Sequence, residues 1–215
     1  MTERTVPTAF VNTLIFAVLK TVIVTVLGFA LALPLNRKLK TTNALRTVYF
    51  IPAILSSLIV GLIFNALFGG RHGVIDSMLA SVGLENLSLP WLGERWPAVF
   101  VISLAEIWRS LGTALVITLA GLQSVPDPYL EAAKVDGATG WQLFRNITLP
   151  LIMPTVNVNI LFSLIFGLKM FDLVYVLTGG GPGHDTETFG TLIMNEMSSG
   201  RYSHSVAINL LFTII

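Results

Sequence analysis

The sequence opens with an apolar segment that is too long for an ordinary helix of a soluble domain. Residues 8–35 contain one charged side chain, Lys20. An α-helix rises about 1.5 Å per residue, so about 20 apolar residues cross a hydrocarbon layer of about 30 Å. The segment is also longer than the apolar stretch of a signal peptide. It therefore predicts a membrane-spanning helix.

The composition agrees with a chain that is solvated by lipid. Of the 215 residues, 53% are hydrophobic and 12% are charged, and the mean hydropathy is +0.77. In soluble domains about a quarter of the residues are charged. The chain has no cysteine, which excludes a disulfide framework and a thiolate metal site. Its net charge of +1 gives no reason to expect nucleic acid binding.

Other apolar segments follow the first one along the chain. They cover residues 48–68, 98–122, 151–177 and 206–215. The last has only ten residues, which reach about half way across a bilayer. We therefore expect an all-α, polytopic helical membrane protein, a single transmembrane domain over residues 1–215 with about five segments. We also expect that the last segment is truncated.

The distribution of charge predicts the orientation of these segments. The first connecting loop has four basic residues and no acidic one. These residues are Arg37, Lys38, Lys40 and Arg46. Basic loops stay in the cytoplasm, so alternation places residues 123–150 inside and residues 69–97 and 178–205 outside. The amino terminus then lies outside, which suggests that a further helix precedes it. Residues 73–84 and 187–197 are too short and polar to span, and each predicts an interfacial or re-entrant helix.

The cytoplasmic segment 126–150, PDPYLEAAKVDGATGWQLFRNITLP, has the signals of two short helices. Asp127 and Pro128 predict an N-cap and a first helical residue, and Gly137 predicts the end of that helix. Thr139 and Gln142 form a capping-box pattern that predicts a second helix. Pro150 fits the start of the next spanning helix. We expect a helix, a turn and a helix at the membrane surface.

The side chains of this segment suit a small rigid docking knob. Glu131 offers one fixed negative charge, and the small Ala132 and Ala133 allow another surface to approach closely. Tyr129 and Trp141 supply apolar bulk. The alternative is an amphipathic connector that only lies on the bilayer, and the physical properties of the segment do not choose between the two.

The same segment resembles the EAA signature of permeases in bacterial binding-protein-dependent ABC importers. The matched positions are Glu131, Ala132, Ala133, Gly137, Ile147, Leu149 and Pro150. In that family the segment is a coupling helix that docks on an ATP-hydrolysing subunit. The resemblance therefore implies that Glu131, Ala132, Ala133, Asp136, Gly137 and Gly140 couple the chain to an ATPase.

Residues 171–189, FDLVYVLTGGGPGHDTETF, are similar to the corresponding stretch of carbohydrate-type permeases, related to the maltose and glycerol-phosphate systems. This resemblance implies inward transport of a sugar or related small polar solute across the bacterial cytoplasmic membrane. It implies four kinds of contact for the chain: two ATP-hydrolysing subunits, a second homologous permease, an extracytoplasmic solute-binding protein and membrane lipid. ATP and Mg would lie on the ATPase partner, with no cofactor in this chain.

The sequence lacks the motifs of a catalytic subunit. It has no Gly-Lys dipeptide, so it contains no P-loop. His72, His184 and His204 form no zinc-protease motif, and we expect no metal site. The chain is therefore not expected to be an enzyme. The main alternative is a secondary transporter or channel, because charges inside a membrane also mark proton relays and ion paths.

Charged residues inside the segments form two candidate pairs. Glu106 and Arg109 are three residues apart, as are Lys169 and Asp172, so each pair can meet on one helix face. Such pairs either neutralise each other within the bilayer or border the transport pathway. Lys20 has no local partner, so we expect it to meet a carboxylate on another helix or a water-filled cavity.

Polar uncharged residues gather on the fourth apolar segment. Sugar hydroxyls need neutral donors and acceptors, which amide and hydroxyl side chains supply. For Asn157 and Asn159 the alternative is hydrogen bonding between helices. Our candidate residues for the substrate pathway are Asn157, Asn159, Ser163, Lys169 and Asp172.

Overall fold

The computed structural model describes residues 2–36, 42–70 and 73–214, and these are helices joined by turns and loops, with no strand among them. The all-α expectation is confirmed. The chain folds as two compact units. Unit 1 comprises Met1–Lys20, Leu55–Arg109 and Ile165–Ile215, and unit 2 comprises Thr21–Ile54 and Ser110–Leu164.

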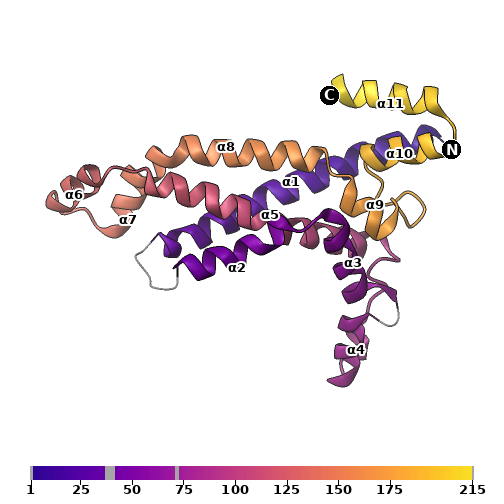
Figure 1. Ribbon diagram of the computed structural model, residues 1–215, viewed down its shortest axis with the longest axis horizontal. Coiled ribbons are helices and arrows are strands. Elements are labelled where there is room, and N and C mark those ends of the chain that lie inside the picture. The colour runs from indigo at the N-terminus through magenta and orange to yellow at the C-terminus, as the bar shows by residue number, and fades with distance from the viewer. Residues whose placement is uncertain (1, 37–41, 71–72, 215) are drawn as a thin grey trace. The chain divides into compact units, whose positions relative to one another are not determined.

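Among the described residues, three stretches of helix are long and apolar enough to cross a membrane. They are Thr5–Leu35 within α1 (Thr2–Leu35), α5 (Arg95–Gln123), and Gly140–Leu168, which ends with α8 (Leu149–Leu168) (Figure 1). Their lengths are 31, 29 and 29 residues. On α1, Val18, Val22 and Val26 lie four residues apart and are 54%, 55% and 60% exposed. An exposed apolar stripe of this kind is expected where lipid, not water, covers a helix.

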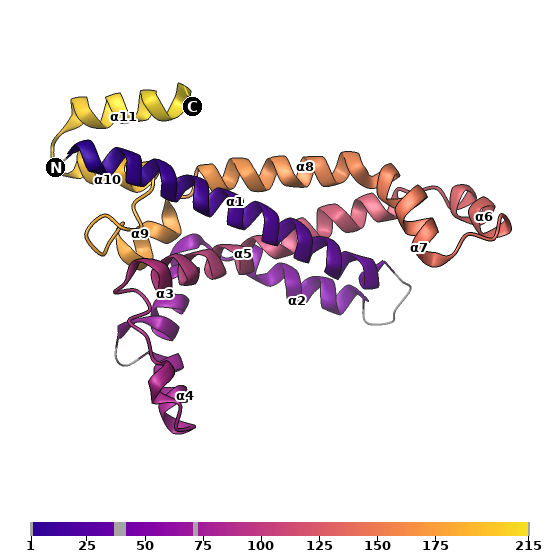
Figure 2. The same cartoon turned by 180° about the vertical axis from the view of Figure 1, so that it is seen from behind.

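Unit 2 packs parts of the long helices α1, α5 and α8 together with shorter helices. The end of α1 and α2 (Thr42–Ile54) lie beside the second half of α5 (Figure 2). The buried core residues are Ala32, Leu35, Leu115, Leu119, Leu122, Val125 and Ile152. Gly112 permits the closest approach, because a Cβ there would lie 2.3 Å from the carbonyl oxygen of Tyr49 on α2. Small residues at contacts of this kind are typical of helices that pack inside membranes.

Unit 1 contains the shorter helices and two apolar clusters. Its helices, besides parts of α1, α5 and α8, are α3 (Ser57–Phe68), α4 (Val74–Ser81), the 3-10 turn η2 (Glu85–Leu87), α9 (Asp172–Thr178), α10 (Phe189–Ser198) and α11 (Tyr202–Ile214). The larger cluster joins Phe16 of α1 to residues of α3, α5 and α9, among them Phe64, Ile102 and Leu173. In the smaller one, Phe189 of α10 stacks on Phe212 of α11 with ring centroids 5.0 Å apart.

The structure breaks two of the segments that the sequence predicts as continuous. The segment 48–68 divides into α2 and α3, because Ser56 caps α3 by accepting a hydrogen bond from the backbone N–H of Ile59 at 3.3 Å. Together these helices pass as a fourth candidate span. The segment 151–177 divides where α8 ends at Leu168 and α9 begins at Asp172. Both breaks carry polar residues, Ser56 and Ser57 at the first and Lys169 and Asp172 at the second, but each lies within an apolar segment long enough to span.

The predicted outer helices are present as α4 and α10, and the last segment is part of α11, which has 13 residues. Figures 1 and 2 both place α10 beside the start of α1.

Of the basic residues used to predict orientation, Arg46 lies in α2. Arg37, Lys38 and Lys40 lie outside the described residues.

Candidate functional site

The segment 126–150 contains the predicted turn between two helices. The first helix is α6 (Asp127–Val135), and its end is a Schellman motif. The N–H of Ala138 donates to the carbonyl of Ala133 at 2.9 Å, and the N–H of Gly137 donates to that of Lys134 at 3.1 Å. Gly137 has φ +79°, and no atom lies within 4 Å of where its Cβ would be. Glycine is therefore favoured here by backbone conformation alone.

The second helix begins with the predicted capping box. Thr139 N–H donates to Gln142 Oε1 at 2.8 Å, and Gln142 N–H donates to Thr139 Oγ1 at 3.4 Å. The helix α7 (Gly140–Leu143) then passes through a π-helical turn, η3 (Phe144–Thr148), directly into α8. Proline lacks the N–H for a regular helical bond, and a wider turn accommodates it. Because α8 begins at Leu149, Pro150 lies in its first turn, as predicted, although the helical stretch also continues back through η3 to Gly140.

The start of α6 also differs from the expectation. The helix begins at Asp127, its N-cap is Pro126, and no side chain caps it. The predicted N-cap is therefore wrong by one residue, because the extended Pro126 takes that position.

One side of this segment is buried in unit 2 and the other is exposed. Leu130 packs against the unit 2 core, and Ala133 is 6% exposed. Phe144 anchors the second helix, with its ring centroid 5.8 Å from that of Phe29 on α1. The exposed apolar side chains are Tyr129, Val135 and Trp141, at 58%, 87% and 66%. Of the predicted coupling residues, those on the exposed surface are Glu131, Ala132, Asp136, Gly137 and Gly140.

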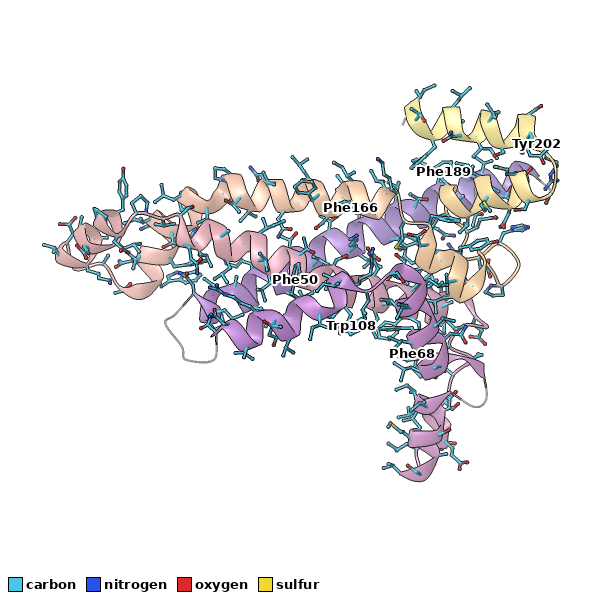
Figure 3. All side chains as sticks on the ribbon, viewed as in Figure 1. Phe50, Phe68, Trp108, Phe166, Phe189 and Tyr202 are labelled. Atoms are coloured by element: carbon cyan, nitrogen blue, oxygen red, sulfur yellow. The ribbon has the colours of Figure 1, made fainter. Side chains whose placement is uncertain are left out.

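A buried network of charges lies within unit 1. Lys20 Nζ of α1 lies 2.5 Å from Glu106 Oε1 of α5, and the two side chains are 5% and 3% exposed. Arg109 Nε and Nη2 donate to the same carboxylate at 3.0–3.2 Å. The expected carboxylate partner of Lys20 on another helix and the expected Glu106–Arg109 pair are both confirmed. Lys20 Nζ also lies 5.6 Å from the ring centroid of Phe166, labelled in Figure 3.

Beside this network is a hollow formed by two cavities of about 450 and 90 Å³, with four lining residues in common. The shared residues are Ser57, Arg109, Phe171 and Asp172. Tyr175 lines the larger cavity, and Lys169 and Phe166 line the smaller one. The hollow therefore combines charged groups with aromatic rings at the two helix breaks.

The charged pair predicted on the fourth segment does not form. Lys169 and Asp172 flank the break between α8 and α9 and so do not share a helix face. No ion pair within 4.0 Å joins them in the described part of the chain. The break is held from outside the helix, because Thr188 Oγ1 donates to the carbonyl of Met170 at 3.0 Å. Both side chains nevertheless line the hollow.

The other predicted pathway residues belong to unit 2. Asn159 is buried and donates from Nδ2 to the carbonyl of Ala114 and to Thr118 Oγ1, both at 3.3 Å. This is the helix-to-helix bonding that the sequence left open as the alternative for Asn159. Ser163 is also buried, and Asn157 is exposed.

Several candidate functional residues were missed by the sequence analysis. Ser57 and Tyr175 line the hollow, but nothing in the sequence brings them to Arg109. At the outer loop, Asn12 of α1 donates to the carbonyls of Asp185 and Glu187 at 2.9 and 3.0 Å. A buried asparagine in an apolar helix was a usable signal for a contact of this kind.

The family described as "Binding-protein-dependent transport system inner membrane component" matches residues 6–215. The trehalose/maltose transport system permease protein of Thermococcus litoralis is 35% identical over 191 residues. That match covers 89% of this chain and 64% of the relative, so the chain spans less than two thirds of the relative's length.

Solved structures of ABC transporters have the same fold as this chain. A bacterial ABC transporter involved in the import of the acidic polysaccharide alginate matches with a TM-score of 0.87 at 26% identity. The match covers 98% of this chain and 74% of the other. A bacterial alginate ABC transporter in complex with an alginate pentasaccharide-bound periplasmic protein matches with a TM-score of 0.83 at 26% identity, over 96% of this chain and 73% of that one.

Proposed function

Because the chain belongs to the family of inner membrane components of binding-protein-dependent transport systems, we propose that it is the permease subunit of an ATP-driven importer. It moves a sugar or related small polar solute inward across the bacterial cytoplasmic membrane. It is a multi-pass subunit with no catalytic residues of its own. A separate subunit binds ATP and Mg and hydrolyses the ATP.

The segment from α6 to α7 is the docking site for that ATPase subunit. Its fixed Schellman turn and capping box make it rigid, and rigidity before contact reduces the entropy lost on binding. Its exposed side chains include the apolar Tyr129, Val135 and Trp141 and the negatively charged Glu131. Aromatic side chains with a central polar anchor are typical of protein interfaces.

The observation that carries the proposal is the continuity of helix from this segment into the membrane. Gly140 to Leu168 forms one helical stretch of 29 residues. A helix transmits displacement along its axis, so a push at Trp141 moves the far end of the same helix, next to Lys169. ATP-driven closure of the ATPase pair would reach the break between α8 and α9 in this way and open the pathway alternately to each side.

The complete importer contains partners beyond the ATPase. By analogy with the family, two ATPase subunits, a second homologous permease and an extracytoplasmic solute-binding protein join this chain. One structural relative was solved with a solute-bound periplasmic protein. The chain supplies one wall of the pathway, at which Lys169 and Asp172 of unit 1 contact the solute. The solutes named for the relatives differ in charge, so they do not choose between a neutral and an acidic saccharide.

Two variants of the docking segment test the proposal in the purified complex. Glu131→Lys inverts a charge offered to the ATPase, and the loss of a buried charge contact reduces binding by roughly 2 to 5 kcal/mol. Gly137→Ala strains the turn, because a residue with a Cβ disfavours positive φ by about 1 to 2 kcal/mol. We expect both variants to lose solute-stimulated ATP hydrolysis, and Glu131→Lys also to lose the ATPase during purification.

Gly83→Ala is the matched control. Gly83 has φ +76° and equally open surroundings, but it lies in the loop between α4 and η2. The same strain there should leave ATP hydrolysis unchanged. An ion-coupled carrier or channel needs no ATPase, so unchanged activity and co-purification in both docking variants would contradict the proposed function.

A further inference from the structure

The ionisable side chains in and behind the hollow do not cancel. Lys20 and Glu106 form one buried pair of opposite charges. Lys169 and Asp172 add one charge of each sign to the lining. Arg109 also lines the hollow, and a guanidinium is always protonated in proteins. Within the described part of the chain, the hollow therefore has one positive charge in excess, on Arg109.

Arg109 has donors available to a ligand. A guanidinium has five N–H donors, and those that contact protein here are on Nε and Nη2, which face Glu106. The Arg109 side chain is 29% exposed, whereas Glu106 is 3% exposed. The carboxylate thus holds the guanidinium in place from the buried side and leaves the other edge to the hollow.

The excess charge lies at the middle of the membrane-spanning helices. Arg109 is the central residue of the 29-residue candidate span Arg95–Gln123. Lys20, on the other side of Glu106, is the central residue of the 31-residue span Thr5–Leu35. An unneutralised charge at this depth is unfavourable and marks a path for ions or substrate. Transporters also bind their solutes near the mid-plane.

Aromatic rings line the same hollow. Phe171 and Tyr175 have ring centroids 5.2 Å apart, and Phe166 lies beside the smaller cavity. Ring faces suit the apolar C–H faces of a sugar, whereas a guanidinium edge binds a carboxylate through two parallel hydrogen bonds. One excess positive charge also matches a carboxylate, which carries one negative charge, better than a phosphate with about 1.5 to 2.

We propose that the imported solute is a saccharide that bears a carboxylate, as a uronic acid does, and that Arg109 selects it by its charge. This inference rests on the proposed importer function and names the substrate class of the same pathway. Glu106 acts as the positioning residue of Arg109, and Lys20 neutralises Glu106 so that the charge of Arg109 remains available.

The test uses the complete transporter, with its partner subunits and solute-binding protein, in proteoliposomes. The probes are a panel of uronic acid disaccharides, each paired with its methyl ester, which has the same shape but no charge. We expect uptake and stimulated ATP hydrolysis at about tenfold lower concentration for the acid, the factor given by one further charge-assisted contact. Arg109→Gln should remove this preference and retain uptake of the ester. Arg109→Lys should retain part of it.

Arg201→Gln removes the same charge outside the hollow and should keep the full preference. Arg201 is 60% exposed, and its partner Glu196 retains a contact with His204 at 2.9 Å. Equal uptake of acid and ester, an unchanged preference in Arg109→Gln, or stronger uptake of a sugar phosphate would each overturn the inference. A complex that responds to no saccharide of the panel would overturn the inference but not the proposed importer function, which the docking variants test separately.

Discussion

Glu106 is the residue on which the buried charges of unit 1 depend. Both of its oxygens contact cations, Lys20 from α1 and Arg109 from its own helix. A buried charge without its partner is strongly destabilising, and the effect is largest where one carboxylate serves two cations. The three residues should therefore differ in how much stability their replacement removes.

Glu106→Gln should destabilise the transporter by about 3 to 5 kcal/mol, because it leaves two cations without a carboxylate. Lys20→Met should cost less, since Arg109 still neutralises Glu106. The measurement is the free energy of unfolding of the purified complex in mixed detergent with increasing dodecyl sulfate. The double variant Lys20→Met/Glu106→Gln should be more stable than Glu106→Gln alone. A Lys20→Met variant that is as unstable as Glu106→Gln would contradict this account.

The sequence predicted the kind of partner for Lys20 but not its identity. An isolated lysine in an apolar segment requires a counter-charge, which follows from the energy of a buried ion. Glu106 lies 86 residues away along the chain, and the pairing depends on how α1 and α5 are rotated against each other. Glu106 and Arg109 could be paired from sequence because helix geometry fixes a spacing of three residues.

Helices were predictable where a single local rule determined them. The capping box at Thr139 and Gln142 and the Gly137 turn formed as expected, because each depends on neighbours within a few residues. The breaks after Ile54 and Leu168 were not predicted. At the second break, Thr188 and Gly190 of a distant segment contact Met170 and Phe171, and such contacts leave no local pattern.

The packing of α5 against α2 gives a prediction for these elements. In Gly112→Ala the new Cβ would lie 2.3 Å from the carbonyl oxygen of Tyr49 and 2.8 Å from the α-carbon of Phe50. Backbone atoms cannot rotate away, so the helices must separate, and overpacking of this kind typically costs about 1 to 3 kcal/mol. The thermal unfolding midpoint of the purified complex should fall.

Val116→Leu is the control for added volume on the same helix. Val116 is 41% exposed, so one further carbon there meets no tightly packed backbone. Its unfolding midpoint should match that of the parent protein. If Gly112→Ala were equally neutral, the close contact between α5 and α2 would not exist in the assembled protein.

The candidate docking segment and the predicted outer helices belong to different units of the molecule. The docking segment follows α5 in unit 2, whereas α4, α10 and the loops beside them belong to unit 1. Alternation of the spans predicts that the docking segment is cytoplasmic and that α4 and α10 are outside. The orientation rests on the basic loop, and Arg46 is the one of its basic residues within the described ranges.

Single cysteines test this orientation directly, because residues 1–215 contain no cysteine to label. Lys134→Cys should react with a membrane-impermeant maleimide only in inverted vesicles, where the cytoplasmic side faces the reagent. Glu85→Cys and Ser199→Cys should react only in intact cells stripped of their outer barrier. All three side chains are exposed in the structure, whereas Glu187 of the same outer loop is fully buried and would report nothing. Ala105→Cys, at 0% exposure, should stay unlabelled from either side and sets the background. Labelling of Lys134→Cys and Glu85→Cys from the same side would contradict the order of spans, and with it the placement of the docking segment where an ATPase can reach it.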